Sequence, residues 1–373
     1  MIEKYYSGVI EQIYNRIGKE TRNIVMANYS NDFSIENLEV IRRYQSNEDN
    51  VFFAYSEFSY NTLIGAYEPF LDIICNMHRR FIGGSFDDFQ KECGVYYLHR
   101  QVLNSYYETG ECFREETVLL NEVAYERRRM TMAIADMLKR LSEVRPLMIV
   151  INRFQMASKS SIETIKYLID NPCASIGIVL GVNALVKGTD STVEVWDRIV
   201  ESLEDRSAIY YIGSAGSLKN NVKTTNDDEL YITMNFEQSI QEASNIMEFL
   251  DFEQAKRGCR IIEHKLKFED AWIDEKSLRR FYMVYARTSV LLGEMSKAIE
   301  LTNEYKALIP KNDSEHYLSL YYFMKGTCYM YQGKLEKAEN CAKSAYDYAV
   351  LAEDDTLIFK AELLSVMIKM SGW

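Results

Sequence analysis

The amino-acid sequence predicts an α/β domain with a parallel sheet, followed by an all-α region made of helical repeats. Between residues 1 and 230, short apolar segments alternate with helical patterns, an order that predicts parallel strands joined by crossover helices. Beyond residue 236 no strand pattern occurs. Within that second region a short motif recurs at similar spacing, as expected of a helical solenoid. We therefore expect two domains, residues 1–230 and residues 231–373.

The strands of the first domain are predicted from short apolar runs, which are typical of buried parallel strands. These runs are residues 23–27, 51–55, 147–151, 176–181 and 208–212. Apolar residues at helical spacing predict helices between them. The helices cover residues 1–20, 34–43, 67–79 and 160–169, with a long helix-rich insert at 86–142. A glycine-rich loop at 213–217 and a polar stretch at 219–229 then end the alternation.

The second domain contains a recurring motif centred on Gly293 and Gly333. Each glycine is followed by Lys-Ala four and five residues later, and a weaker copy has Leu250 in place of the glycine. The motif resembles the tetratricopeptide repeat, in which a glycine lies at the turn between helices A and B. The motif recurs at a longer interval than the usual ~34 residues, which predicts longer helices or loops. An ordinary helical bundle is the alternative.

Residues 355–373 have the pattern of the first helix of a further repeat. Because solenoids end in a polar capping helix, we expect the repeats to continue past Trp373. In tetratricopeptide-like units, three helix A positions around the turn glycine face a concave groove, which is the recognition surface of a solenoid. Here these positions are Arg287, Val290, Glu294, Thr327, Met330 and Lys334. The alternative is that this face packs against the α/β domain or a second subunit.

The segment from Pro146 to Leu168 carries a second resemblance. A proline, an apolar strand, Gln155, Ala157 and a helix starting near Ser161 follow one another without a gap. This segment is similar to the Walker B region of signal-transduction ATPases with numerous domains, a P-loop group of the AAA+ type that includes maltose-regulator-like transcription activators. The resemblance implies a P-loop-type fold for the first domain.

The residues that perform the family's chemistry are replaced at the end of this strand. Where the family has two acids, the sequence has Asn152 and Arg153. Carboxylates hold Mg²⁺, directly or through water, and a polar group orients the attacking water. An amide binds Mg²⁺ weakly and an arginine repels it, so the resemblance implies a site that has lost hydrolysis.

The phosphate loop is replaced in the same way. The family's glycines, lysine and hydroxyl residue align with Ala27, Asp32, Phe33 and Ser34, of which only Ser34 fits the pattern. Without glycines the backbone cannot surround phosphate, and without lysine nothing neutralises it. We therefore expect a pseudo-ATPase that is not an enzyme and needs no cofactor or metal. A nucleotide switch with unusual ligands is the alternative.

Charge and cysteine content restrict the partners and the compartment. The net charge of −12 disfavours nucleic acid, whose backbone a negative protein repels. The basic run 127–129 fits a solvated helix face. Seven cysteines without regular spacing predict reduced thiols in a cytoplasmic protein. No apolar stretch is long enough to cross a membrane, and the first residues do not have the pattern of a signal peptide.

Together these patterns predict a non-catalytic signalling or regulatory protein. Its solenoid would bind a protein, a peptide or a second copy of the chain. By analogy with the maltose-regulator-like group, it could be the sensor part of a transcriptional regulator. An output domain such as a LuxR-type helix-turn-helix would then lie outside this chain. A purely structural scaffold is a further alternative.

Overall fold

The computed structural model describes residues 2–29, 38–46, 50–59, 63–112, 122–183, 198–203, 209–212, 235–268, 273–312 and 314–371. The chain divides into two compact units. The first contains Met1–Phe113 and Tyr125–Met234, and the second contains Arg114–Ala124 and Asn235–Trp373. The first is an α/β unit and the second is all-α in its described residues.

The first unit is built on a parallel sheet. Its strands are β1 (Ile24–Tyr29), β2 (Phe52–Glu57), β3 (Leu147–Asn152), β4 (Ile176–Asn183) and β5 (Ile209–Ile212). They lie in the order β2-β3-β4-β1-β5, and each neighbouring pair is parallel. Each strand overlaps one of the predicted apolar runs. Every residue of β3 is buried, which explains why its apolar run is the clearest in the sequence.

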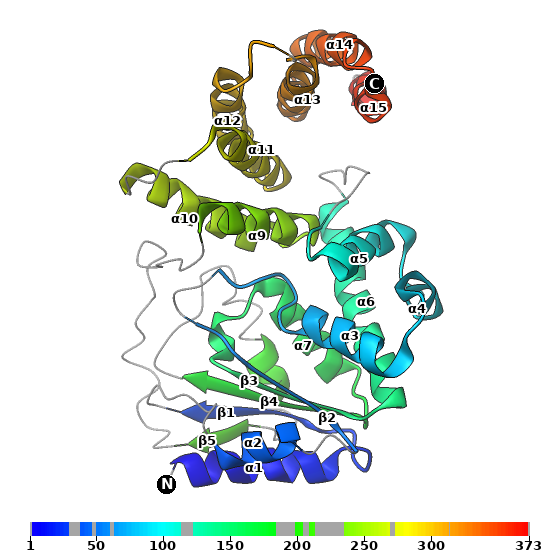
Figure 1. Ribbon diagram of the computed structural model, residues 1–373, viewed down its shortest axis with the longest axis vertical. Helices are drawn as coiled ribbons and strands as arrows, with labels where there is room; N and C mark the ends of the chain where they lie inside the picture. Colours follow the sequence, from blue (N-terminus) through cyan, green and yellow to red (C-terminus); the bar gives the residue numbers. More distant parts are fainter. Residues whose placement is uncertain are drawn as a thin grey trace. The chain divides into compact units, whose positions relative to one another are not determined.

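Helices cover both faces of this sheet (Figure 1). One face carries α1 (Ile2–Arg16) and α2 (Glu39–Ser46), and the other carries α3 (Phe70–Met77), α6 (Val123–Val144) and α7 (Lys159–Asp170). A π-helical turn, His78–Ile82, continues α3, and a 3-10 turn, Phe154–Met156, follows β3. The core beneath α1 includes Tyr6, Ile10 and Ile13, packed with Val150 and Val179.

Two glycines on β4 let α1 approach the sheet closely. Gly177 and Gly181 are separated by an even number of positions and therefore face the same side of the strand. A Cβ at Gly177 would lie 2.7 Å from the Cδ1 of Ile17. A Cβ at Gly181 would overlap the Tyr6 hydroxyl and would lie 2.8 Å from the Asn152 Oδ1. Any larger side chain at either position would push α1 or Asn152 away.

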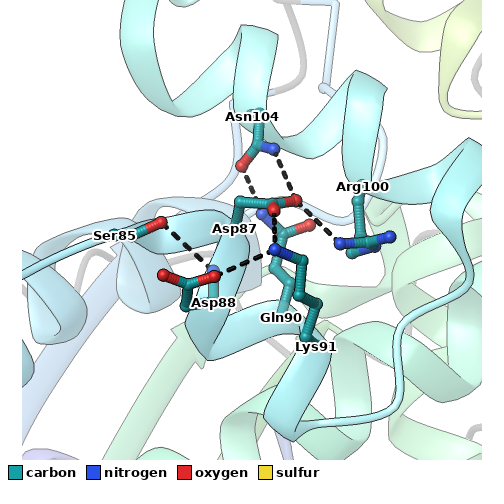
Figure 2. A network of polar contacts seen from close by, with 7 residues as sticks. All are labelled: Ser85, Asp87, Asp88, Gln90, Lys91, Arg100 and Asn104. Carbon is teal, nitrogen blue, oxygen red and sulfur yellow. Dashed lines mark hydrogen bonds and ion pairs between the residues drawn. The ribbon is translucent and has the colours of Figure 1, made fainter.

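The insert between α3 and β3 contains α4 (Phe86–Glu92) and α5 (Tyr97–Thr109) in addition to α6. A polar network joins α4 to α5 (Figure 2). Asp87 accepts hydrogen bonds from Arg100 and Asn104, at 3.0 and 3.1 Å, and forms an ion pair with Lys91 at 2.7 Å. Gln90, which is fully buried, donates to Asn104 over 2.5 Å. One carboxylate thus holds three partners on two helices.

The second unit is a succession of helices. They are α9 (Phe236–Glu248), α10 (Phe252–Phe268), α11 (Glu275–Leu291), α12 (Met295–Ala307), α13 (Glu315–Tyr331), α14 (Leu335–Leu351) and α15 (Asp355–Ser371). Each helix packs against the next along the chain. The starts of α11, α13 and α15, at positions 275, 315 and 355, are evenly spaced and define a constant repeat period.

The turn after α11 shows how the predicted glycine acts. Gly293 has a φ of 78°, in the left-handed region. Its N–H donates to Val290 O, and the N–H of Glu294 donates to Ser289 O. This pair of bonds is a Schellman motif, which satisfies the last carbonyls of a helix. Gly333 and Leu250 have φ values of 72° and 68° and end α13 and α9 in the same way.

All seven cysteines lie within the described residues, and all are free thiols. In the parts of the chain that the structure describes, no helix has both the length and the hydrophobicity needed to cross a membrane.

Candidate functional site

Two regions could carry function: the carboxyl edge of the sheet and a cavity in the helical unit. The strands are parallel, so the carboxyl ends of β1 and β3 emerge at the same edge, where ligands bind in open α/β sheets. Ala27 lies within β1, is fully buried, and pairs with Gly181 on one side and Tyr210 on the other. The remaining phosphate-loop positions, Asp32, Phe33 and Ser34, lie outside the described residues.

Asn152 and Arg153 stand together where β3 ends. Asn152 is the last residue of the strand and is fully buried. Arg153 has a left-handed φ of 55°. Its Nη1 lies 2.8 Å from Oε1 of Glu57 at the end of β2, and it donates to the Phe58 carbonyl over 3.3 Å. A guanidinium paired with a carboxylate therefore occupies this point.

The helical unit contains a cavity of about 270 Å³. Its walls come from α9, α11, α13 and α15, together with Leu250 and the first residue of α10. These are alternate helices along the chain, and they are called the A helices below. The lining residues are Met247, Glu248, Leu250, Phe252, Met283, Arg287, Val290, Leu291, Leu320, Phe323, Met324, Thr327, Tyr331, Lys360, Leu363, Leu364 and Met367.

The wall of this cavity is apolar and adaptable. Each of the four A helices contributes one methionine: Met247, Met283, Met324 and Met367. Methionine is unbranched and polarisable, so it adjusts to ligands of different shape and is common at surfaces that accept several partners. The volume is close to the lower end of the range for small-ligand sites, roughly 300 Å³. It can hold a few large apolar side chains.

A few polar groups interrupt the apolar wall. Arg287 on α11 pairs with Glu248 on α9, with 2.9 Å between Nη1 and Oε1. Lys360 on α15 adds a second cation. Thr327 donates its hydroxyl to the Phe323 carbonyl over 2.9 Å. Two cations and one carboxylate line the cavity, so its net charge is positive, whereas the chain as a whole carries −12.

The residues predicted for the groove divide into two sets. Arg287, Val290 and Thr327 line the cavity. The other three do not, and each has contacts elsewhere.

Glu294 pairs with Lys256 on α10. Lys334 donates to the Gln332 side chain over 2.7 Å. Met330 is 6% exposed and belongs to an apolar cluster with Ala338 and Ala342 of α14. The structure thus places Met330 between helices rather than in the cavity wall.

The contributions of α9 and α15 to the cavity were not predicted. The signal for α15 is the constant repeat period, which makes Met367 the counterpart of Thr327 and Arg287. Shifting the predicted groove position Thr327 by one further repeat period leads to Met367. The signal for α9 is weaker, because its unit has Leu250 where the others have glycine, but the position three residues before Leu250 is Met247, which lines the cavity.

Metal-ligand clusters and reactive thiols are the remaining features of the described residues that bear on chemistry. Within the described residues, no group of three or more His, Cys, Asp or Glu side chains could hold a metal ion. Burial raises the pKa of Cys75 to about 11 and that of Cys328 to about 12. These thiols stay protonated at neutral pH, and the thiol is a poor nucleophile compared with the thiolate.

No family model matches the sequence, and no curated protein matches it.

Proposed function

We propose that this protein is a non-catalytic signalling protein whose helical unit binds a peptide segment of a partner protein. The cavity between the A helices is the observation that carries the proposal. It is concave, mostly apolar and crossed by a few fixed polar groups, which are the usual properties of a binding site. The repeating helices support the assignment, since solenoids present concave surfaces for recognition.

The charge of the cavity indicates the chemistry of the peptide. Arg287 and Lys360 outnumber the single carboxylate of Glu248 in the wall. A positive site in a protein of charge −12 favours a ligand with a carboxylate near its apolar side chains. The peptide that we propose has two or three large apolar residues, which enter the cavity, and at least one Asp or Glu.

Selection from a phage-displayed library of random peptides tests the proposal. Peptides enriched on the full chain should combine apolar and acidic residues. Their affinities are then measured by fluorescence anisotropy on variants of the protein. Met283→Trp fills the cavity and Lys360→Glu reverses a charge in its wall, so each should weaken binding by about tenfold or more.

A matched charge reversal serves as the control. Lys343 is exposed on α14 and does not line the cavity. Lys343→Glu should therefore bind the selected peptides like the unchanged protein. Enriched peptides that bind Met283→Trp with full affinity would place recognition elsewhere. A selection that enriches no peptide, although a small apolar dye binds the cavity, would also contradict the proposal.

The α/β unit, in this proposal, retains a P-loop-type fold but does not hydrolyse nucleotide. Asn152 and Arg153 support it, because the Walker B positions present an amide and a paired guanidinium instead of carboxylates. Mg²⁺ is a hard cation that prefers carboxylate and water oxygens. In this proposal the α/β unit has no hydrolytic role, and the activity of the protein is the peptide binding of the helical unit.

Phosphate release from ATP and GTP with Mg²⁺ tests this second part. We expect no turnover above that of heat-inactivated protein. Turnover that disappears in both Ser34→Ala and Arg153→Ala would overturn the proposal and favour a working nucleotide switch. Turnover that persists in both variants would indicate a contaminating ATPase.

A further inference from the structure

The α/β unit has a small cavity of its own, with a volume of about 60 Å³. It lies where β2 and β3 begin. Phe52, the first residue of β2, donates its N–H to the Pro146 carbonyl, and Arg145 directly precedes that proline. Phe52 and Arg145 both line the cavity. Because the strands are parallel, this is the edge of the sheet opposite to Asn152, so the cavity is separate from the Walker B positions.

Two arginines give this cavity a positive charge. Arg80 comes from the π-helical turn that follows α3, and Arg145 comes from the segment between α6 and β3. Among the described residues, no Asp or Glu lines the cavity. The Nε of Arg145 is buried and has no hydrogen-bond partner in the described part of the chain. A buried donor without an acceptor is costly, and a ligand that supplies an acceptor removes this cost.

Aromatic rings hold the two arginines in position. The Cζ of Arg145 lies 4.8 Å from the ring centroid of Phe81. The Cζ of Arg80 lies 5.3 Å from the same ring and 5.7 Å from the ring of Phe52. Cation–π attraction favours these contacts, so Phe81 brings both guanidinium groups to one place. The rings also exclude water, and the attraction between opposite charges is stronger where water is excluded.

We propose that this cavity binds a phosphate group, either free phosphate or a small phosphate monoester, between Arg80 and Arg145. A water molecule needs roughly 10–15 Å³ of cavity volume, so the cavity accepts about four to six heavy atoms, a range that includes phosphate. A guanidinium presents a fork of donors that matches two phosphate oxygens. Two guanidinium groups also balance the charge of a phosphate dianion.

Two neutral polar residues complete the cavity wall. Tyr44 and Gln45, at the end of α2, contribute a hydroxyl and an amide to the lining residues. Burial raises the pKa of Tyr44, so its hydroxyl keeps its proton at neutral pH. Both side chains can therefore donate hydrogen bonds to an anion, as the arginines do.

Isothermal titration calorimetry of the full chain with sodium phosphate tests the proposal, with sodium chloride keeping the ionic strength constant. We expect one site with a Kd of about 1 mM or lower. Arg145→Gln should weaken binding by about tenfold or more, because a charged hydrogen-bond donor is lost. Arg80 is exposed, so Arg80→Gln should keep the melting temperature of the unchanged protein and still weaken binding by a similar factor.

A matched arginine outside the cavity is the control. Arg140 is exposed on α6, bonds to Glu143 over 2.7 Å, and does not line the cavity. Arg140→Gln should therefore bind phosphate like the unchanged protein. Acetate should bind at least about tenfold more weakly than phosphate, since it carries a single charge. Phenyl phosphate distinguishes the source: binding as tight as that of phosphate indicates a monoester, and exclusion of the ester indicates free phosphate.

Three results would overturn the proposal. The first is an unchanged protein that does not bind phosphate. Occupation of the cavity by Glu48 or Asp49, which lie outside the described residues, would give this result. The second is phosphate binding that persists in both Arg145→Gln and Arg80→Gln, and the third is acetate binding as tight as that of phosphate. Neither arginine lines the cavity of the helical unit, so peptide binding should persist in both variants, and the two proposals fail separately.

Discussion

At the scale of single residues, four equivalent helix ends show how much of a turn depends on one backbone angle. Gly293, Gly333, Leu250 and Glu353 all have a positive φ, and each donates its N–H back to the helix that it ends. Only glycine adopts this conformation without strain. The two glycines made the turns predictable from the motif. Glu353 carries no such signal, because nothing in a glutamate indicates a left-handed residue.

Removing a glycine at one of these positions and introducing one at another should change the free energy of unfolding in opposite directions. Gly333→Ala should lower the free energy of unfolding by about 1 kcal/mol through backbone strain, since a Cβ there would meet no neighbouring atom. Glu353→Gly should raise it by about 0.5–1 kcal/mol, because relief of strain exceeds the added chain entropy. Urea denaturation monitored by circular dichroism measures both. An alanine variant as stable as the unchanged protein would contradict the argument.

Asp87 shows what a single carboxylate contributes when three partners surround it. Hydrogen bonding to Lys91 lowers its pKa most, and Asn104 and Arg100 lower it further. A lowered pKa stabilises the fold above the ordinary carboxyl pKa, about 4. That stability is lost as the pH falls towards the lowered value in the folded state.

Asp87→Ala should therefore cost about 1 kcal/mol at neutral pH, because the carboxylate is partly exposed and its ion pairs are screened. The difference from the unchanged protein should shrink as the pH falls from about 7 to 3. Asp88→Ala is the matched control, since Asp88 has Lys91 as its cationic partner and is more exposed. It should have the smaller effect. Urea midpoints across this pH range provide the measurement, and a constant difference would refute the assigned cause.

At the scale of elements, the sequence predicted the strands more accurately than the helices. Buried parallel strands are short and apolar, so each one was found within a few residues. The insert at 86–142 was predicted only as helix-rich, whereas the structure divides it into α4, α5 and α6. α4 and α5 end next to Gly94 and Gly110, which both have a positive φ, but a single glycine in the sequence does not show by itself that a helix ends there. The ion pair between Arg153 and Glu57 was also beyond prediction, because the two residues are adjacent only in the folded sheet.

Met330 can be assigned either to the groove or to the packing between helices, and the two assignments predict different stabilities for its variants. It was predicted to face the groove, but it packs against α14 and α15 in an apolar cluster. Met330→Glu should therefore cost about 3 kcal/mol or more by burying a charge without a partner. Met330→Leu, which conserves volume, should cost less than about 1.5 kcal/mol. Thermal melts of both variants distinguish the two assignments. A Met330→Glu protein with unchanged stability would show that Met330 is exposed in the groove.

At the scale of the whole molecule, the expectation of two domains rests on the order of strand and helix patterns along the sequence. The predicted boundary after residue 230 and the observed one after Met234 differ by only a few residues, because strand patterns stop before 236. The cavity could be predicted only in part. Arg287, Val290 and Thr327 follow from the motif, and extending its positions to the neighbouring units would have added Met247 and Met367, whereas the other lining residues depend on how successive helices stack.

The helical unit should fold without the α/β unit. Residues 235–373 have their own buried helices, and solenoid repeats contact mainly their neighbours. Expressed alone, this segment should give a helical circular dichroism spectrum and a cooperative thermal transition. It should also bind the selected peptides as tightly as the full chain does. A segment that is unfolded, or folded without peptide binding, would show that recognition needs residues of the first unit.

The constant period of α11, α13 and α15 has a consequence for engineering. Because these helices start at evenly spaced positions, residues 295–334 form a cassette that runs from the start of one B helix to the start of the next. A tandem duplication of this cassette would keep every later helix in phase. The recognition surface would lengthen by one A helix, while the helices that follow the duplicated cassette keep their own sequences. The length of the ligand could thus be set by the number of cassettes.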